Sequence, residues 1–353
     1  LYHWSANRLL SDSRRCPFQN QKPSAMEIIP PPIVPNDHPP VRFGQVALTE
    51  DATVFRHAMN REMMRFFHSL PPSTHTDAVV FCMQHFRTPF FPKFDYFRNY
   101  PSPAWSVIHW IGQHFAGRLP PAPEDDRLAR TAHAMALFLH PLDDHLNDGQ
   151  LPATHLHLLL RSQAWLHMHA ALERLATRVP EGAALVRGFI DAYYASIGSP
   201  TAVPTLEGYS AHFRNQMATG LMVPVLMAKM AAGDAFAAAI ETAYQAFGVA
   251  WRLLDDLQDM VTDMASGSHS AIYFCLPSAI QKQWDQPSRG DDRARYEAIR
   301  SAVKRGGIVD IITVKIRTEL TQAASAMDAV QMTGLAEELR CLARPFTEAP
   351  DRI

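Results

Sequence analysis

Hydrophobic residues recur at helical spacing along almost the whole chain from about residue 41 onward. No segment shows the strict alternation of apolar and polar residues that marks a half-buried strand. Stretches rich in proline and glycine divide the pattern into runs of roughly 15 to 30 residues, an ordinary length for the helices of a large bundle. The pattern therefore predicts an all-α protein built as a large antiparallel helical bundle.

The first 40 residues differ from the rest in composition. Prolines crowd the segment Ile28-Ile-Pro-Pro-Pro-Ile-Val-Pro-Asn-Asp-His-Pro-Pro, and proline has no backbone N–H for a regular hydrogen-bond ladder. We expect residues 1–40 to form a disordered, proline-rich tail, within which Met26 is a candidate native start. No linker-like stretch interrupts residues 41 to 345, so residues 41–353 are expected to form a single all-α domain.

Composition limits the partners and the compartment. The 353 residues are 47% hydrophobic and carry a formal net charge of -2, which gives no electrostatic reason to expect a nucleic acid as partner. The longest apolar run, from Met217 to Ala228, contains Pro224 and is too short for a membrane span, which takes about 20 residues. The cysteines lack the spacing of a zinc site or a disulfide framework, which favours a reduced, cytoplasmic protein.

Two aspartate clusters end two of the apolar helical runs. The acidic residues that matter are Asp143, Asp144 and Asp148 in the first cluster, and Asp255, Asp259 and Asp263 in the second. Residues four apart lie on one face of a helix, where like charges destabilise it. A chain that does this twice is expected to compensate with a cation, and hard oxygen ligands suit Mg²⁺ bridging carboxylates to a phosphate.

Other interpretations of the acidic clusters fit less well. One aspartate pair on a helix is most often a solvated face, but two dense clusters, each ending an apolar stripe, argue against that explanation. Counted from Asp144 as an EF-hand loop, Leu146 falls on a ligand position and His155 replaces the terminal glutamate, so a calcium loop is excluded. A di-iron bundle needs Glu-x-x-His pairs, and none lies beside these aspartates.

Apolar side chains lie about one helical turn before each cluster. Trp251 and Phe247 precede Asp255 in steps of four, and Phe138 precedes Asp143, although Pro141 can kink that helix. Two such helices, opposed, would enclose a central apolar cavity with carboxylates at its mouth. A prenyl diphosphate, which joins an apolar tail to an anionic, metal-binding head, fits that shape.

These segments resemble known motifs. The run Phe247-Gly-Val-Ala-Trp-Arg-Leu-Leu-Asp-Asp-Leu-Gln-Asp259 is similar to the second aspartate-rich helix of the trans-prenyl diphosphate synthases. The segment from Gly267 to Pro277 resembles the loop that follows it, and Phe138-Leu-His leading into Asp143 resembles the first aspartate-rich helix. The helix from Tyr209 to Gly220 resembles the one between, so the likeness to the class I isoprenoid synthase superfamily covers roughly residues 120 to 345.

The resemblance implies an all-α barrel of helices around a deep apolar cavity and, by family habit, a homodimer. It implies Mg²⁺, about three ions with substrate bound, held by oxygen ligands at the mouth. The implied metal ligands are Asp143, Asp144, Asp148, Asp255, Asp259 and Asp263, of which Asp143, Asp144 and Asp255 are the catalytic candidates.

Departures from the family pattern argue against a chain-elongating activity. Elongating members carry paired arginines after the first motif and a Gly-Lys-Arg element near the N-terminus, which bind isopentenyl diphosphate. Here Gly-Gln-Leu-Pro follows Asp148, and only Val41-Arg-Phe-Gly precedes the first motif. Without those counter-charges a second diphosphate is poorly held. The spacing of Asp255, Asp259 and Asp263 also matches the metal triad of class I terpene synthases.

A single diphosphate still has candidate partners. These are Arg214, Thr219, Arg252 and His269, each of which can instead serve in a surface ion pair or a helix contact. The candidates for the cavity wall are Phe138, Asn215, Phe247 and Trp251. Gly220 and Pro224 predict a break in the intervening helix. That break either turns carbonyls toward a carbocation, as in terpene synthases, or is an ordinary kink.

The first hypothesis is a Mg²⁺-dependent class I terpene synthase that ionises one prenyl diphosphate, then cyclises or quenches the carbocation and releases diphosphate. Phe138, by analogy with the family, favours a C15 or C20 substrate. The second is a trans-prenyl diphosphate synthase or another prenyltransferase. The third, a non-catalytic partner subunit, would predict eroded aspartates, and these are nearly intact.

Overall fold

The computed structural model describes residues 41–116, 122–147, 149–197, 204–286 and 293–347. Residues 1–40, expected to form a tail, lie outside the described residues, as does Asp148. Val41–Ile353 forms one compact unit. All regular structure among the described residues is helical, as predicted.

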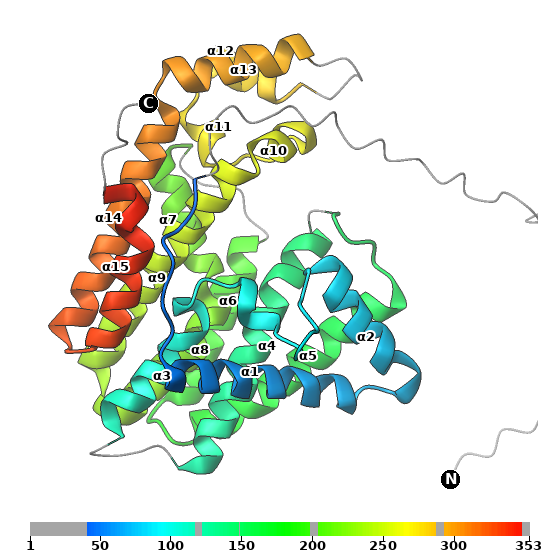
Figure 1. The fold of residues 1–353 in the computed structure, drawn as a ribbon, viewed down its shortest axis with the longest axis vertical. Helices are drawn as coiled ribbons and strands as arrows, with labels where there is room; N and C mark the ends of the chain where they lie inside the picture. The colour runs from blue at the N-terminus through cyan, green and yellow to red at the C-terminus, as the bar shows by residue number, and fades with distance from the viewer. Residues whose placement is uncertain (1–40, 117–121, 148, 198–203, 287–292, 348–353) are drawn as a thin grey trace, which may run out of the picture. The chain divides into compact units, whose positions relative to one another are not determined.

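Helices follow one another with short connections (Figure 1). Their bounds are α1 Glu50–Ser69, α2 Pro72–His85, η1 Tyr96–Asn99, α3 Pro103–Phe115, α4 Pro123–Asn147, α5 His155–Ala176, α6 Gly182–Ile197, α7 Leu206–Gln216, α8 Ala218–Ala232, α9 Asp234–Gln258, α10 Met260–Ser266, α11 Ala271–Cys275, α12 Ser278–Trp284, α13 Arg293–Arg305, α14 Ile308–Ala329 and α15 Thr333–Thr347.

Threonine side chains fix the start of three helices. Thr49, Thr154 and Thr205 each accept a hydrogen bond from a backbone N–H in the first turn of α1, α5 and α7. Such caps satisfy donors that the helix itself leaves unpaired. The polar residue before each apolar run therefore sets where these helices begin.

The core is organised around α8. Every residue of α8 from Ala218 to Ala228 is buried, which is the pattern of a helix that is apolar on all sides and enclosed by others. It packs against α4 on one side and α9 on the other, and α9 packs in turn against α14. Because α4 and α9 flank the same buried helix, their C-terminal ends can present the two aspartate clusters to one region.

None of the helices in the described part of the chain is long and apolar enough to cross a bilayer.

Candidate active site

The two aspartate rows lie at the C-terminal ends of α4 and α9. Burial, together with the neighbouring carboxylates of Asp259, Asp256 and Asp144 and against the opposing effect of Arg252, raises the pKa of Asp255 to about 6. Asp144 belongs to α4 and Asp255 to α9. Like charges raise a carboxyl pKa only at short range, so the two helix ends bring their acids together.

Asp144 is the free carboxylate of the first row. It is exposed and makes no hydrogen bond or ion pair with any described residue. α4 continues through Pro141 to Asn147, so the proline does not separate Asp144 from the helix. Asp148, its expected partner one turn later, lies outside the described residues.

Asp143, by contrast, is already neutralised by the protein. Its carboxylate accepts hydrogen bonds from Arg161 Nε at 2.7 Å and Nη2 at 3.2 Å, and from the Tyr193 hydroxyl at 3.2 Å. Trp165 Nε1 donates a further bond at 3.4 Å. A buried carboxylate held by a bidentate arginine is a structural anchor, so the structure favours Asp144 over Asp143 as an oxygen ligand at the mouth.

The second row is not the single helical stripe that the spacing predicts. α9 ends at Gln258, Asp259 is its C-cap with φ −100° and ψ 11°, and α10 starts at Met260. Asp255 and Asp259 remain partly or fully exposed, whereas Asp263 Oδ2 is buried without a hydrogen-bond partner among the described residues. Burial, together with the nearby charge of Asp256, raises the pKa of Asp263 to about 7. After the break at Asp259, one oxygen of Asp263 is therefore enclosed by protein.

Asp256 holds the base of the site together. It is 2% exposed and accepts hydrogen bonds from Ala271 N at 2.8 Å and the Tyr209 hydroxyl at 3.2 Å. Arg252 Nε lies 3.1 Å from its Oδ1 and donates to the Tyr209 oxygen at 2.8 Å. One carboxylate therefore ties α9 to α7 and to the start of α11.

Two cavities open beside the end of α9. The acidic cavity, about 580 Å³, is lined by Asp144, Asn147, Tyr209, Arg252, His269 and Tyr273 among others. The arginine cavity, about 370 Å³, is lined by Arg56, Arg98, Tyr100, Trp251, Asp255 and Gln258 among others. Arg252 lines the acidic cavity and Asp255 the arginine cavity, and Arg252 Nη1 is 3.9 Å from Asp255 Oδ2.

Of the four predicted diphosphate ligands, two line the acidic cavity. Arg252 keeps its Nη groups free of close partners other than Asp255 among the described residues, and its guanidinium lies 5.8 Å from the Phe213 ring centroid. His269 stacks on Tyr273 and contacts Asp285 Oδ1 at 2.8 Å. Both therefore bring a cationic or protonatable group to the lining of the acidic cavity.

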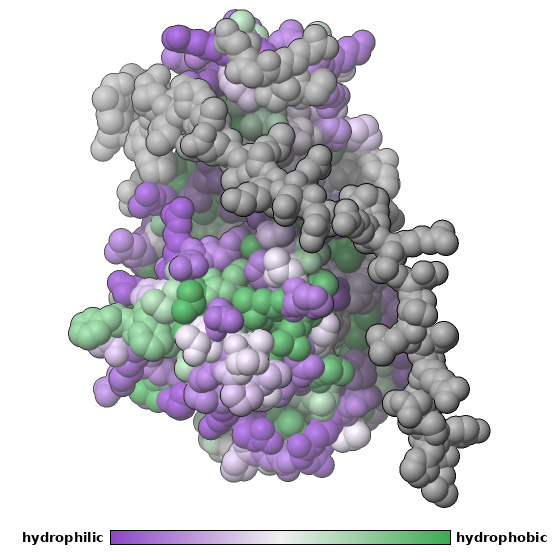
Figure 2. Space-filling view, turned by 90° about the vertical axis from the view of Figure 1, so that its right-hand side faces the viewer, coloured by the Kyte–Doolittle hydropathy of each residue, from purple (hydrophilic) through white to green (hydrophobic). Residues whose placement is uncertain are grey.

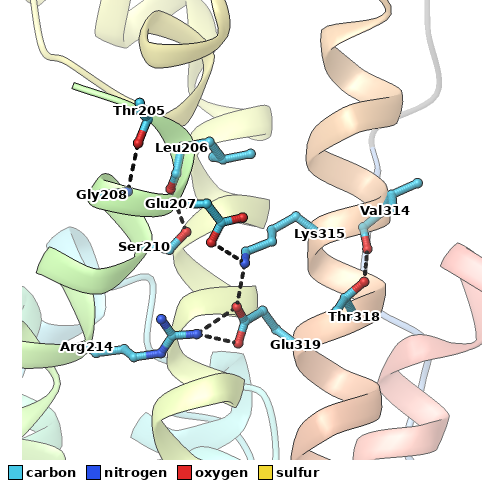
Figure 3. A network of polar contacts seen from close by, with 10 residues as sticks. All are labelled: Thr205, Leu206, Glu207, Gly208, Ser210, Arg214, Val314, Lys315, Thr318 and Glu319. Atoms are coloured by element: carbon cyan, nitrogen blue, oxygen red, sulfur yellow. Dashed lines mark hydrogen bonds and ion pairs between the residues drawn. The ribbon is translucent and has the colours of Figure 1, made fainter. Parts of the chain in front are cut away.

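The other two predicted diphosphate ligands lie elsewhere. Arg214 donates to both oxygens of buried Glu319 on α14, which also pairs with Lys315 (Figure 3). Thr219 is 2% exposed inside α8 and lines neither cavity. Because Glu319 is 1% exposed, Arg214 serves as the counter-charge that a buried carboxylate requires.

The predicted wall residues also divide. Trp251 lines the arginine cavity and contacts the Tyr100 ring at 5.6 Å between centroids. Phe247 and Phe138 are fully buried, the latter in an aromatic cluster with Phe66, Phe67, Phe86 and Tyr96. Asn215 is exposed and lines neither cavity. Phe138 and Phe247 are therefore packed protein core, whereas Trp251 is the predicted wall residue that lines a cavity.

Several residues of the site were not predicted from the sequence. Arg56 and Arg98 reach the arginine cavity from α1 and η1, and Arg161 and Tyr193 reach Asp143 from α5 and α6. None of them belongs to a motif or to a periodic pattern that the chain displays locally. Only the tertiary arrangement reveals them.

The carboxylates fit a divalent metal that substrate helps to hold. Among the described residues, no group of three or more His, Cys, Asp or Glu side chains is placed to hold a metal ion by itself. Asp144, Asp255 and Asp259 supply hard oxygen donors on both sides of the mouth, and Mg²⁺ usually takes one or two carboxylates together with substrate phosphates and water. One or two of these carboxylates would therefore hold an ion only together with a substrate phosphate and water.

Comparisons with known proteins identify the fold. No family model matches the chain, and no curated protein matches it in sequence. A geranylgeranyl pyrophosphate synthase from Corynebacterium glutamicum, complexed with calcium and isoprenyl diphosphate, superposes with a TM-score of 0.62 at 15% identity, covering 87% of this chain and 98% of that one. A polyprenyl synthase from Caulobacter crescentus, in complex with the same ligands, gives 0.61 at 14%, covering 86% and 98%.

A geranylgeranyl pyrophosphate synthetase from Pyrococcus horikoshii gives a TM-score of 0.57 at 13% identity, covering 85% of this chain and 98% of that one. The chain therefore has the fold of the class I isoprenoid synthases, as its sequence motifs predict.

Proposed function

We propose that the protein is a Mg²⁺-dependent prenyltransferase that ionises an allylic prenyl diphosphate and joins the prenyl group to an anionic acceptor, with isopentenyl diphosphate as the first candidate. The observation that carries this proposal is the arginine cavity beside Asp255. Terpene synthesis needs one diphosphate site, whereas elongation needs two. Two polar cavities flanking one carboxylate row suit the second requirement.

Roles follow from the placement of the side chains. In the acidic cavity, Arg252 and His269 would bind the leaving diphosphate opposite Asp144. Bound Mg²⁺ would supply the charge neutralisation that lets the allylic C–O bond ionise. Trp251, in the wall of the arginine cavity, offers a ring face to the carbocation that remains.

The arginine cavity offers positive charge for a second diphosphate, which the sequence motifs alone did not indicate. The basic acceptor motifs of elongating enzymes are missing, but Arg56 and Arg98 bring positive charge to the same cavity from other segments. Arg56 is paired with Asp95 at 3.2 Å, whereas Arg98 is exposed and has no ion pair among the described residues. Arg98 is accordingly the better candidate for the acceptor anion.

A terpene synthase remains the second candidate, and the pairing of Arg56 with Asp95 favours it because that pair leaves one uncompensated arginine in the cavity. The two functions separate in one assay. Purified protein and Mg²⁺ are incubated with geranyl, farnesyl or geranylgeranyl diphosphate, with and without isopentenyl diphosphate, and products are identified by mass spectrometry. Prenyltransfer predicts a longer diphosphate only when isopentenyl diphosphate is present.

Hydrocarbon or alcohol formed from a single substrate would instead establish a terpene synthase. No turnover of any substrate, in protein that is folded, would point to a non-catalytic subunit. The same substrate panel measures the preferred chain length.

Arg98→Gln tests the acceptor site itself. Loss of a charged hydrogen bond, typically about 1.5–3 kcal/mol, is expected to raise the KM for isopentenyl diphosphate at least tenfold. The KM for the allylic substrate should change less than about threefold, because Arg98 lines only the arginine cavity of the two. Arg317→Gln, on the exposed side of α14, is the matched control. Equal effects on both KM values would remove Arg98 from the acceptor site.

A further inference from the structure

The loop between α2 and η1 displays two phenylalanines to solvent. Phe90 is 51% exposed and Phe91 is 89% exposed. At the two ends of the loop, Phe86 packs against Phe138 and Phe94 is buried against Phe67. The same short segment thus buries the phenylalanines at its base and exposes the two at its tip.

Hydrogen bonds fix the base of this loop. Thr88 N donates to Cys82 O at 3.2 Å, and Asp95 N donates to Pro89 O at 3.0 Å. Asn99 Nδ2 donates to the carbonyl of Arg87 at 3.2 Å. A loop closed in this way presents its tip as a defined protrusion, so the exposure of Phe90 and Phe91 is part of the fold.

Positive charge flanks the exposed rings. Arg87 and Lys93 are exposed and have no ion pair with any described residue, and no acidic residue lies between them in the chain. Val80 and Met83, on the last turns of α2, add further exposed apolar surface at 39% each. Figure 2 looks onto the side of the molecule where α2 and α5 lie and shows hydrophobic side chains gathered there among polar ones.

We propose that this loop, Arg87 to Lys93, is an interfacial anchor that rests on the surface of a bilayer containing anionic lipids. Aromatic rings flanked by basic side chains are the combination that binds at the boundary of headgroups and acyl chains. A convex tip of two rings covers far less than the roughly 1,000 Å² that a stable protein interface needs. A bilayer accepts such a tip without a complementary groove.

An anchor of this kind is independent of the chemistry in the cavities. It would hold the protein where lipids with prenyl tails partition, without a membrane-spanning helix. Attachment through two rings and two charges is reversible and sensitive to salt, because the basic residues act through a screened surface potential.

Vesicle sedimentation tests the proposal on the full chain. Vesicles of phosphatidylcholine with about 30% phosphatidylserine are compared with pure phosphatidylcholine. The wild-type chain is expected to bind the anionic vesicles more tightly, and Phe90→Ser/Phe91→Ser should weaken binding at least tenfold. Arg87→Gln/Lys93→Gln should weaken binding to anionic vesicles about 25-fold, at about fivefold per charge, and abolish the preference for them.

Ile311→Ser/Val314→Ser is the control, because it removes two comparably exposed apolar side chains from α14. Unchanged binding by this control supports the anchor. Absence of vesicle binding by the wild-type chain would overturn it, as would equal losses in the control and in the Phe90→Ser/Phe91→Ser variant. Self-association that depends on Phe90 and Phe91, without vesicle binding, would show that the tip is a contact between copies of the chain.

Discussion

Replacing Asp255 by asparagine is expected to lower the rate of allylic diphosphate turnover about a thousandfold, equivalent to about 4 kcal/mol of transition-state stabilisation. Asp255 is the carboxylate that lines the arginine cavity and lies 3.9 Å from Arg252, and the charge of Asp144 contributes to its raised pKa. The amide keeps the shape of the side chain but removes the charge that a phosphate-bound divalent ion needs. Turnover is measured as Mg²⁺-dependent diphosphate release at saturating substrate.

The same substitution should stabilise the protein without ligands. The pKa of Asp255 is raised from an ordinary 3.8 to about 6, so between these values the native state binds more protons than the unfolded chain. Stability therefore falls as pH rises through that window, and the penalty is fully present above it. Asp255→Asn removes the penalty, and its Tm at pH 8 is expected to be equal to or slightly above that of the wild type, because half of the side chain is exposed.

Asp255→Asn is thus expected to lower activity without lowering stability. This combination distinguishes a carboxylate that serves the reaction from one that serves the fold. Asp310→Asn, at an exposed position of α14, should change neither property. Turnover by Asp255→Asn within tenfold of the wild type would show that this carboxylate does not serve the reaction. A marked fall in Tm would show that it serves the fold instead.

The sequence was sufficient for those features that depend on local periodicity. Helical spacing predicts the all-α fold, and the apolar runs that end in acids predict the two helices, α4 and α9, that carry the aspartate clusters. Trp251 and Arg252 fall on cavity walls because they share the α9 helix with Asp255. Each of these inferences needs only the position of a residue on its own helix.

Features that depend on a partner from another helix were beyond the sequence. Asp143 has the same local setting as Asp144, and only the approach of donors from α5 and α6, chiefly Arg161, distinguishes them. Arg214 was expected at the diphosphate because it lies on the helix that resembles the family's intervening helix, but it donates instead to both oxygens of buried Glu319 on α14. The role of a charged side chain depends on which opposite charge lies nearest to it, and only the tertiary structure determines that partner.

The helix break at Asp259 has a related origin. The spacing of Asp255, Asp259 and Asp263 assumes a continuous helix, whereas Asp256 anchors the start of α11 and the chain must turn after α9 to reach it. One oxygen of Asp263, Oδ2, is buried after that turn. The carboxylate with no predicted role is therefore the one that shapes the second cluster.

Asp256→Asn is expected to destabilise the protein by about 3 kcal/mol, the usual cost of leaving a buried charge without its partner. The amide can still accept one hydrogen bond, but its NH₂ group would face the Arg252 guanidinium, which is a donor itself. Tm and the urea midpoint measure the loss. Asp77→Asn, an exposed position on α2, is the matched control and should change neither.

A double-mutant cycle with Arg252→Gln identifies the cause of that loss. If Asp256 stabilises the fold by pairing with Arg252, the double variant should be about 1–3 kcal/mol more stable than the sum of the two single losses predicts. The neutral glutamine no longer needs a counter-charge, so the second substitution removes most of the penalty of the first. Additive losses would instead assign the effect to the hydrogen bonds that Asp256 accepts from Ala271 and Tyr209, which do not involve Arg252.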